Sequence, residues 1–123
     1  AVTHLPVAEP HVVCGQIHDA DDDVTVFRLE GTNLYITDGN TTHAQLLTSN
    51  YTLGTVFTVK FTVTGGKIYY DYNGTRLSYT QSKSFSGAYF KAGCYTQSNT
   101  STGDVSDAYG EVVVYDVQVT HTN

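Results

Sequence analysis

Short runs with strand-like alternation, separated by glycine-containing turns, constrain the fold of this chain more than any other feature of its sequence. Such runs recur at 11–18, 24–30, 33–37, 43–48, 55–64, 67–72, 75–80, 88–97 and 110–120. The pairs Gly65-Gly66 and Asn73-Gly74 lie between neighbouring runs, where tight hairpin connections are expected. A helical period of 3.6 residues does not emerge. The sequence therefore predicts an all-β, antiparallel sandwich.

Composition agrees with this fold and excludes some classes of function. The chain has 123 residues, with 10 Tyr, 11 Gly and neither Met nor Trp, which favours strands and turns within a single domain, residues 1–123. A formal net charge of −6 argues against nucleic acid as the main partner. No stretch is long and apolar enough to cross a membrane.

The run 89–97 has an unusually polar face. Because alternate side chains of a strand point to opposite faces, Tyr89, Lys91, Tyr95 and Gln97 share one face. The residues between them are apolar or small and can pack into a core. A cation, phenols and an amide in one row suit an anionic, hydroxyl-rich ligand.

A smaller version of this pattern lies in the run 11–18. Gln16 and His18 point one way, with side chains about 7 Å apart on one face. Neighbouring subsites of a polymer cleft, or two groups that act on one sugar ring, need about that spacing.

Together, these two motifs resemble a known enzyme family. Gln16-Ile17-His18, followed by Tyr-Phe-Lys-Ala-Gly-Cys-Tyr-Thr-Gln at 89–97, is similar to the paired motifs of the alginate lyases of polysaccharide lyase family seven. The resemblance covers 11–121 and corresponds to the C-terminal part of a catalytic domain roughly twice this length. It implies a jelly-roll β-sandwich, incomplete without an N-terminal half, in which both motifs lie on the concave sheet of the substrate groove.

The resemblance also implies a reaction, the β-elimination of alginate to unsaturated oligosaccharides. Gln16 would stabilise charge on the uronate carboxylate, and His18 would remove the proton at C5. Tyr95 would protonate the departing O4 oxygen, and it could also act as the base if its pKa were lowered. Three further residues would contact carboxylates and hydroxyls of the polymer: Lys91, Gln97 and Tyr89.

The resemblance also implies a substrate preference, and one motif of the family is missing from this chain. In this family an isoleucine at the position of Ile17 is associated with guluronate-containing substrates, so guluronate-rich alginate is expected. The family's substrate-binding arginine lies on an Arg-rich strand of the N-terminal half, whereas Arg28 and Arg76 lie in no such pattern. The alternative is therefore a non-catalytic carbohydrate-binding β-sandwich that keeps the groove. A structural segment that is stable only with its complementary chain is a third interpretation.

Strand parity also bears on the cysteines. Cys14 shares parity with Gln16 on the polar face, whereas Cys94 lies on the buried face of its run. Unless a bulge near Gly15 shifts the register, the two sulfurs lie on opposite sides of the sheet. Two free thiols are expected.

The remaining expectations concern partners and cofactors. The histidines lack zinc-ligand spacing, and Asp19–Asp23 lacks the glycine and glutamate of a calcium loop, so no metal or other cofactor is predicted. We expect a secreted, extracellular protein that binds alginate. A complementary N-terminal segment or self-association is also expected, because half of a sandwich exposes strand edges and apolar faces. Polar residues 38–42 and 98–108 should form loops.

Overall fold

The computed structural model describes residues 1–19, 23–39, 42–83, 89–96 and 109–115. Their strands are β1 (Val2–His4), β2 (His11–His18), β3 (Asp23–Glu30), β4 (Asn33–Asp38), β5 (Thr42–Thr48), β6 (Val59–Thr64), β7 (Lys67–Tyr72), β8 (Thr75–Ser82), β9 (Tyr89–Thr96) and β10 (Glu111–Val112). Every strand pairing is antiparallel, which confirms the predicted all-β class. No helix long and apolar enough to span a membrane occurs among these residues.

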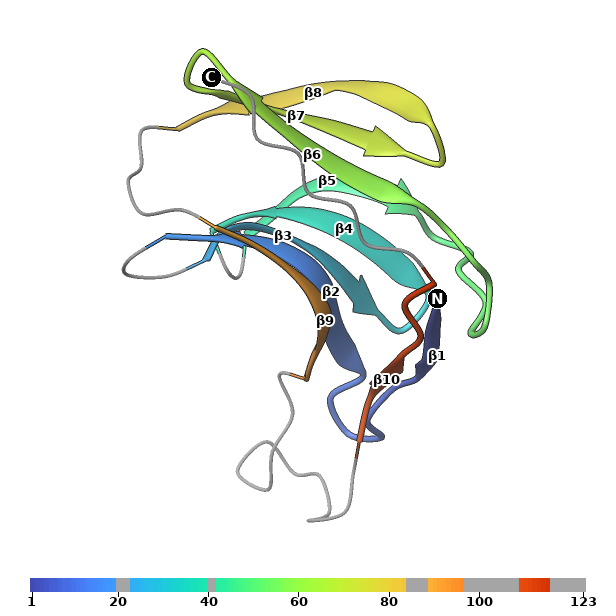
Figure 1. The fold of residues 1–123 in the computed structure, drawn as a ribbon. Coiled ribbons are helices and arrows are strands. Elements are labelled where there is room, and N and C mark those ends of the chain that lie inside the picture. Colours follow the sequence, from blue (N-terminus) through green and yellow to red (C-terminus); the bar gives the residue numbers. More distant parts are fainter. Residues whose placement is uncertain (20–22, 40–41, 84–88, 97–108, 116–123) are drawn as a thin grey trace.

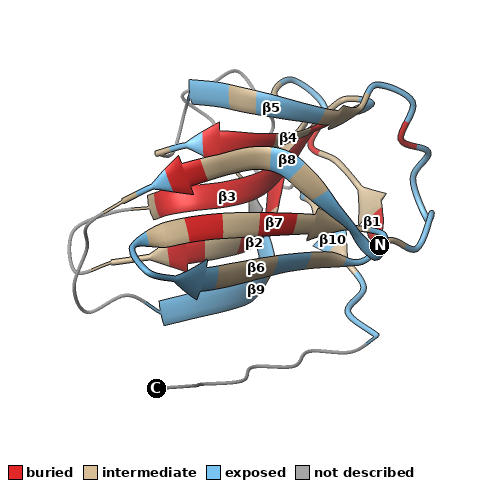
Figure 2. Ribbon diagram, turned by 90° about the horizontal axis from the view of Figure 1, so that it is seen from above, coloured by how far each residue is buried: buried red, intermediate tan, exposed pale blue. Residues whose placement is uncertain are grey.

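Two sheets form the sandwich. The five-stranded sheet has the order β5-β4-β3-β2-β9 and packs against the three-stranded sheet β6-β7-β8 (Figure 1). Ile17, Phe27 and Ile36 of the first sheet form one core cluster with Ile68 and Tyr70 of β7. Burial is greatest along β3 and β4 and falls toward β5, β6 and β9 (Figure 2). A separate β1-β10 ribbon lies at one end.

Both predicted hairpins are present. Gly65-Gly66 connects β6 to β7, and Asn73-Gly74 connects β7 to β8. Asn73 and Gly74 have φ angles of 50° and 81°, the left-handed values that an Asn-Gly hairpin turn needs. These two connections were predictable because the turn residues themselves specify the backbone.

Some strand boundaries differ from the prediction. β6 begins at Val59, because residues 51–58 cross the end of the sandwich, where the Tyr51 hydroxyl donates to the Thr55 carbonyl at 2.6 Å. The last predicted run contributes Glu111–Val112 among the described residues, and its end lies outside them. The predicted loop 98–108 also lies outside the described residues.

β1 was not expected at all. Its Val2 is fully buried and pairs with Val112 of β10, so this ribbon joins segments near opposite ends of the chain.

Paired bulges set the direction of the side chains on β2 and β9. Between Val13 and Gly15, the register of β2 shifts against both β3 and β9. The side chain of Cys14 therefore packs against both core clusters, and its Sγ lies 3.5 Å from the carbonyl oxygen of Phe27. The expected position of Cys14 on the polar face was wrong, because the extra residue shifts the alternation.

Both cysteines are nevertheless free thiols, as expected. Burial raises the pKa of the Cys14 thiol to about 12, so this sulfur remains protonated at neutral pH.

Candidate active site

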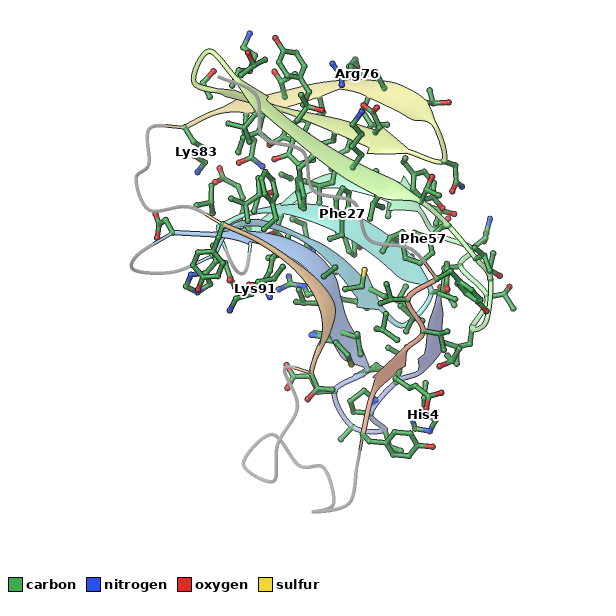
Figure 3. The ribbon with its side chains drawn as sticks, in the orientation of Figure 1. His4, Phe27, Phe57, Arg76, Lys83 and Lys91 are labelled. Carbon is green, nitrogen blue, oxygen red and sulfur yellow. The ribbon has the colours of Figure 1, made fainter. Side chains whose placement is uncertain are left out.

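One face of the five-stranded sheet, the face that points away from β6–β8, carries the predicted site residues that the structure describes. In the pairing of β2 with β9, Gln16 lies opposite Lys91 and His18 lies opposite Tyr89. Residues directly opposite on antiparallel strands have Cβ atoms about 5 Å apart. Lys91 and Phe27 lie on opposite sides of this sheet, with Phe27 between the sheets (Figure 3). The structure thus brings four predicted residues together.

The structure describes one of the predicted site residues only in part and another not at all. The backbone of Tyr95 pairs with Val13 of β2, one bulge away from Gln16. Nothing beyond this backbone position is described for Tyr95, and Gln97 lies outside the described residues. Their roles stay predictions.

His18 has a defined tautomer and an acidic neighbour. Its Nδ1 lies 2.7 Å from the carbonyl oxygen of Asp19, and because a carbonyl oxygen only accepts, Nδ1 carries the proton. Its Nε2 lies 3.7 Å from Oδ1 of Asp23, and the ring of Tyr89 is 5.5 Å away. In neutral His18 the Nε2 lone pair can accept a proton, and the Asp23 carboxylate then stabilises the imidazolium.

Lys91 supplies an exposed cation beside these groups. Its Nζ lies 5.2 Å from the centroid of the Tyr89 ring, within the range of a cation–π contact. A cleft of about 210 Å³ lies at the bulged seam between the strands, lined by residues 13–16 and 91–94. Gly93 has a φ of 155°, which favours glycine, and the position that a Cβ would take there faces open space.

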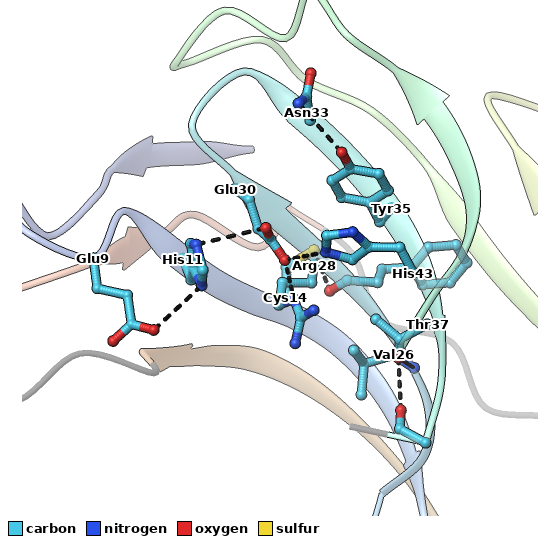
Figure 4. A network of polar contacts seen from close by, with 12 residues as sticks. Glu9, His11, Cys14, Val26, Arg28, Glu30, Asn33, Tyr35, Thr37 and His43 are labelled. Carbon is cyan, nitrogen blue, oxygen red and sulfur yellow. Dashed lines mark hydrogen bonds and ion pairs between the residues drawn. The ribbon is translucent and has the colours of Figure 1, made fainter. Parts of the chain in front are cut away.

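Sequence reasoning missed a charged network on the same face. Oε2 of Glu30 lies 2.7 Å from Nε of Arg28 and 2.6 Å from Nε2 of His43, and its Oε1 lies 3.5 Å from Nε2 of His11 (Figure 4). Burial acts to raise the pKa of Glu30. The His43 hydrogen bond and the neighbouring positive charges outweigh burial and lower the pKa below its ordinary 4.5. Glu30 is therefore a carboxylate at neutral pH.

Arg28 is almost fully buried in this network, with a side chain only 4% exposed. The signal that could have found it is the alternation of β3, because Phe27 and Leu29 face the core and Arg28 must face the other way. Arg28 lies in no arginine motif of the sequence, so motif comparison gave no reason to place it beside the site.

Arg76 lies elsewhere. It is on the outer side of the three-stranded sheet (Figure 3), with its Nε 2.8 Å from Oδ1 of Asp71 and its guanidinium 5.0 Å from the centroid of the Tyr69 ring. Arg76 therefore takes no part in this site. Within the described ranges, no group of three or more His, Cys, Asp or Glu residues is arranged to hold a metal ion.

Known structures share this arrangement of strands. The structure is similar to the crystal structure of the alginate lyase from Corynebacterium sp., with a TM-score of 0.93 and 57% identity over 99% of this chain and 55% of that chain. Alginate lyase AlgAT5 from polysaccharide lyase family 7 matches with a TM-score of 0.83 and 57% identity, over 89% of this chain and 50% of that chain.

A more distant match has the same fold. The truncated AlyQ with CBM32 and alginate lyase domains gives a TM-score of 0.86 and 33% identity, over 100% of this chain and 40% of that chain. The chain thus spans about half the length of the first two proteins, or less than half for AlyQ. Comparison with curated protein sequences gave no match. The structural matches confirm the predicted jelly-roll sandwich.

The family profile described as alginate lyase matches residues 1–121, nearly the whole chain. This match, the motifs, the fold and the 57% identity to two alginate lyases together show the family. The chain belongs to the alginate lyases of polysaccharide lyase family 7.

Proposed function

We propose that this chain forms the acid–base part of the substrate groove of an alginate lyase that cleaves guluronate-rich alginate by β-elimination. The observation that carries the proposal is the register of β2 and β9, with Gln16 and His18 directly opposite Lys91 and Tyr89. One short stretch of sheet thus presents an amide, an imidazole and an exposed cation. A uronate ring needs these groups around its carboxylate and the neighbouring C–H bond.

Each of these residues has a separate role in the proposed reaction. Gln16 donates a hydrogen bond to the substrate carboxylate, and Lys91 contributes positive charge, so that charge developing beside C5 is stabilised. His18 accepts the C5 proton at Nε2, and Asp23 stabilises the resulting imidazolium from 3.7 Å. The electron pair of the C5–H bond forms the C4=C5 double bond as the C4–O4 bond breaks. Tyr95 donates its phenolic proton to O4.

Stereochemistry supports separate acid and base groups. In guluronate, the C5 proton and the O4 leaving group lie on opposite faces of the ring, so an anti elimination needs a base on one side and an acid on the other. His18 and Tyr95 suit this division. Ile17 lies in the core directly behind the site face, 1% exposed, and supports the guluronate preference through the family association of isoleucine at this position.

Initial rates on purified guluronate and mannuronate blocks test this proposal, with the unsaturated product followed by its ultraviolet absorbance. We expect faster cleavage of guluronate blocks and a loss of at least about 100-fold on them for His18→Ala. His4→Ala is the matched control, since His4 lies on β1 away from Lys91 (Figure 3). A clear preference for mannuronate would refute both the specificity and the separate roles of the two groups.

A carbohydrate-binding domain without lyase activity is the second candidate, because the chain spans about half of its relatives' length. Retention of the protein on immobilised alginate with no unsaturated product would favour this candidate.

We also infer that the site works together with a complementary segment of the family's domain. Phe90 and Val63 are 38% and 39% exposed although they are large apolar residues of β9 and β6. β9 ends the five-stranded sheet in the described part of the chain, so a further strand can pair with it. A stable monomer of this chain alone, measured by light scattering, would contradict this inference.

Secretion of the protein is a further proposal, because an intact alginate polymer is too large to reach an enzyme inside the cell. Fractionation of the producing cells tests it, with the protein expected in the culture medium.

A further inference from the structure

Two stacked rings lie on the site face at a distance from Gln16 and His18. Tyr35 of β4 and His43 of β5 have ring centroids 4.0 Å apart and an interplanar angle of 1°. Tyr35 is the register partner of Arg28, which places both on the face away from the core. The side chain of His43 is 44% exposed, so it can meet a ligand.

Neighbouring groups fix both rings in place. Nε2 of His43 is 2.6 Å from Oε2 of Glu30, and Glu30 is in turn held by Arg28 at 2.7 Å. Nδ2 of Asn33 donates to the Tyr35 hydroxyl at 3.3 Å. A side chain that is already ordered loses little conformational entropy when it binds a ligand. The pair is therefore suited to recognition rather than only to packing.

The local charge also permits an anionic ligand. Glu30 is the one carboxylate at the centre of this network, and it is surrounded by the guanidinium of Arg28 and the imidazoles of His11 and His43. Arg28 balances the charge of Glu30, and the second carboxylate of the network, Glu9, lies 3.6 Å from Nδ1 of His11, on the side of that ring away from Tyr35 and His43 (Figure 4). A uronate carboxylate would meet hydrogen-bond donors here and little repulsion.

The distance from the proposed catalytic residues to Tyr35 and His43 corresponds to a few sugar units of the same polymer. Neighbouring strands lie about 4.8 Å apart, so β5 is about 14 Å from β2 across the sheet. A pyranose ring is about as long as one strand spacing. A chain that lies across the strands with its reacting bond at β2 and β9 therefore reaches Tyr35 and His43 with a sugar that takes no part in the chemistry.

We propose that Tyr35 and His43 form a distal subsite that binds the carboxylate or hydroxyls of a uronate unit two or three sugars from the cleaved bond. The subsite rests on the proposed function, since it uses the same polymer. Its effect is confined to substrates long enough to reach β4 and β5.

Steady-state kinetics of the His43→Gln variant test this subsite. The variant removes the ring and keeps a polar side chain. We expect KM for long guluronate polymer to rise about fivefold to tenfold, with kcat unchanged. The shortest oligomer that the enzyme cleaves should give unchanged constants. His4→Gln is the matched control, because His4 also stacks on a tyrosine, Tyr109, at 3.8 Å and 8°.

Equal losses on long and short substrates, or no change on either, would overturn the subsite. Tyr35→Phe keeps the ring stack and removes only the hydroxyl, so it provides a second test if His43→Gln lowers the melting temperature. We expect this variant also to weaken binding of long polymer selectively. Absence of product with the wild-type protein would refute the proposed lyase function instead. The subsite would then be tested by the affinity of long and short guluronate oligomers for the same variants.

Discussion

Gly110 packs directly against the seam between β2 and β9, and its replacement by alanine should disturb both stability and the site. A Cβ at this position would lie 2.7 Å from Cγ2 of Val12 and 2.8 Å from Cγ2 of Thr96. Favourable carbon contacts are about 3.5–4.0 Å, so each methyl would have to move by about 1 Å. Val12 is fully buried in the core and opposes Thr96 across the seam. The strain therefore falls on the strand pair that carries the site.

The magnitude follows from this geometry. Overpacking of a well-packed core costs about 1–3 kcal/mol, and the lower entropy of the unfolded alanine chain offsets about 0.5 kcal/mol. Thr96 is partly exposed and can yield, so we expect Gly110→Ala to reduce the free energy of unfolding by about 1–2 kcal/mol. For the 123 residues of this chain, this lowers the melting temperature by about 4–8 °C. Displacement of the neighbouring Val13–Tyr95 pair should reduce turnover by about tenfold or more.

Calorimetry and lyase rates of the protein measure both effects, with Gly15→Ala as the matched control. A Cβ at Gly15 would lie 3.6 Å from Cδ2 of Phe27 and 3.9 Å from the Lys91 carbonyl, which are ordinary contacts. Gly15→Ala should therefore leave stability unchanged or raise it by up to about 1 kcal/mol. If Gly110→Ala melts within about 1 °C of the wild type and cleaves alginate normally, the packing argument is wrong.

Three further predictions concern single side chains. Tyr95→Phe should keep the fold and lower turnover by about 100-fold or more, because only the proton donor is lost; near-normal turnover would leave Tyr95 without a catalytic role. Lys91→Ala should raise KM and weaken its dependence on salt, and an unchanged KM at low salt would exclude Lys91 from the groove. The lowered pKa of Glu30 stabilises the fold fully above its ordinary 4.5, and this contribution is lost as the pH falls through the folded value. The stability difference between wild type and Glu30→Gln should therefore shrink below pH 4.5, and a difference that stays constant in pH-dependent melts would contradict the network.

The parts of the fold that depend on neighbouring residues were predictable. The alternation at Gln16 and His18 is correct because both residues lie on the same side of the bulge in β2. The Asn73-Gly74 hairpin is specified by residues that adopt positive φ. Local periodicity and turn chemistry carry this information directly.

Features that depend on distant segments were not predictable from local patterns. The β1-β10 ribbon pairs residues more than one hundred positions apart, and alternation says nothing about such partners. The orientation of Cys14 required knowledge of a bulge whose partner strand, β9, is far along the chain. Alternation along β3 indicates the face that carries Arg28 and Glu30, but the contact of Glu30 with His43 of β5 depends on the order of the strands in the sheet.

The bulge in β2 also decides which face of the sheet carries the residues that follow it. Side chains before and after it follow opposite parities, so Val13 and Gln16 share a face although they are three residues apart. The two residues of the bulge, Cys14 and Gly15, both face the core, and only Gly15 has a partner on β3, Phe27. Deletion of Cys14 would therefore restore simple alternation and leave Gln16 and His18 on the site face. Closure of the bulge with Cys14 retained would instead turn Gln16 and His18 toward the core and Ile17 outward, and it would abolish the site without altering any of its residues.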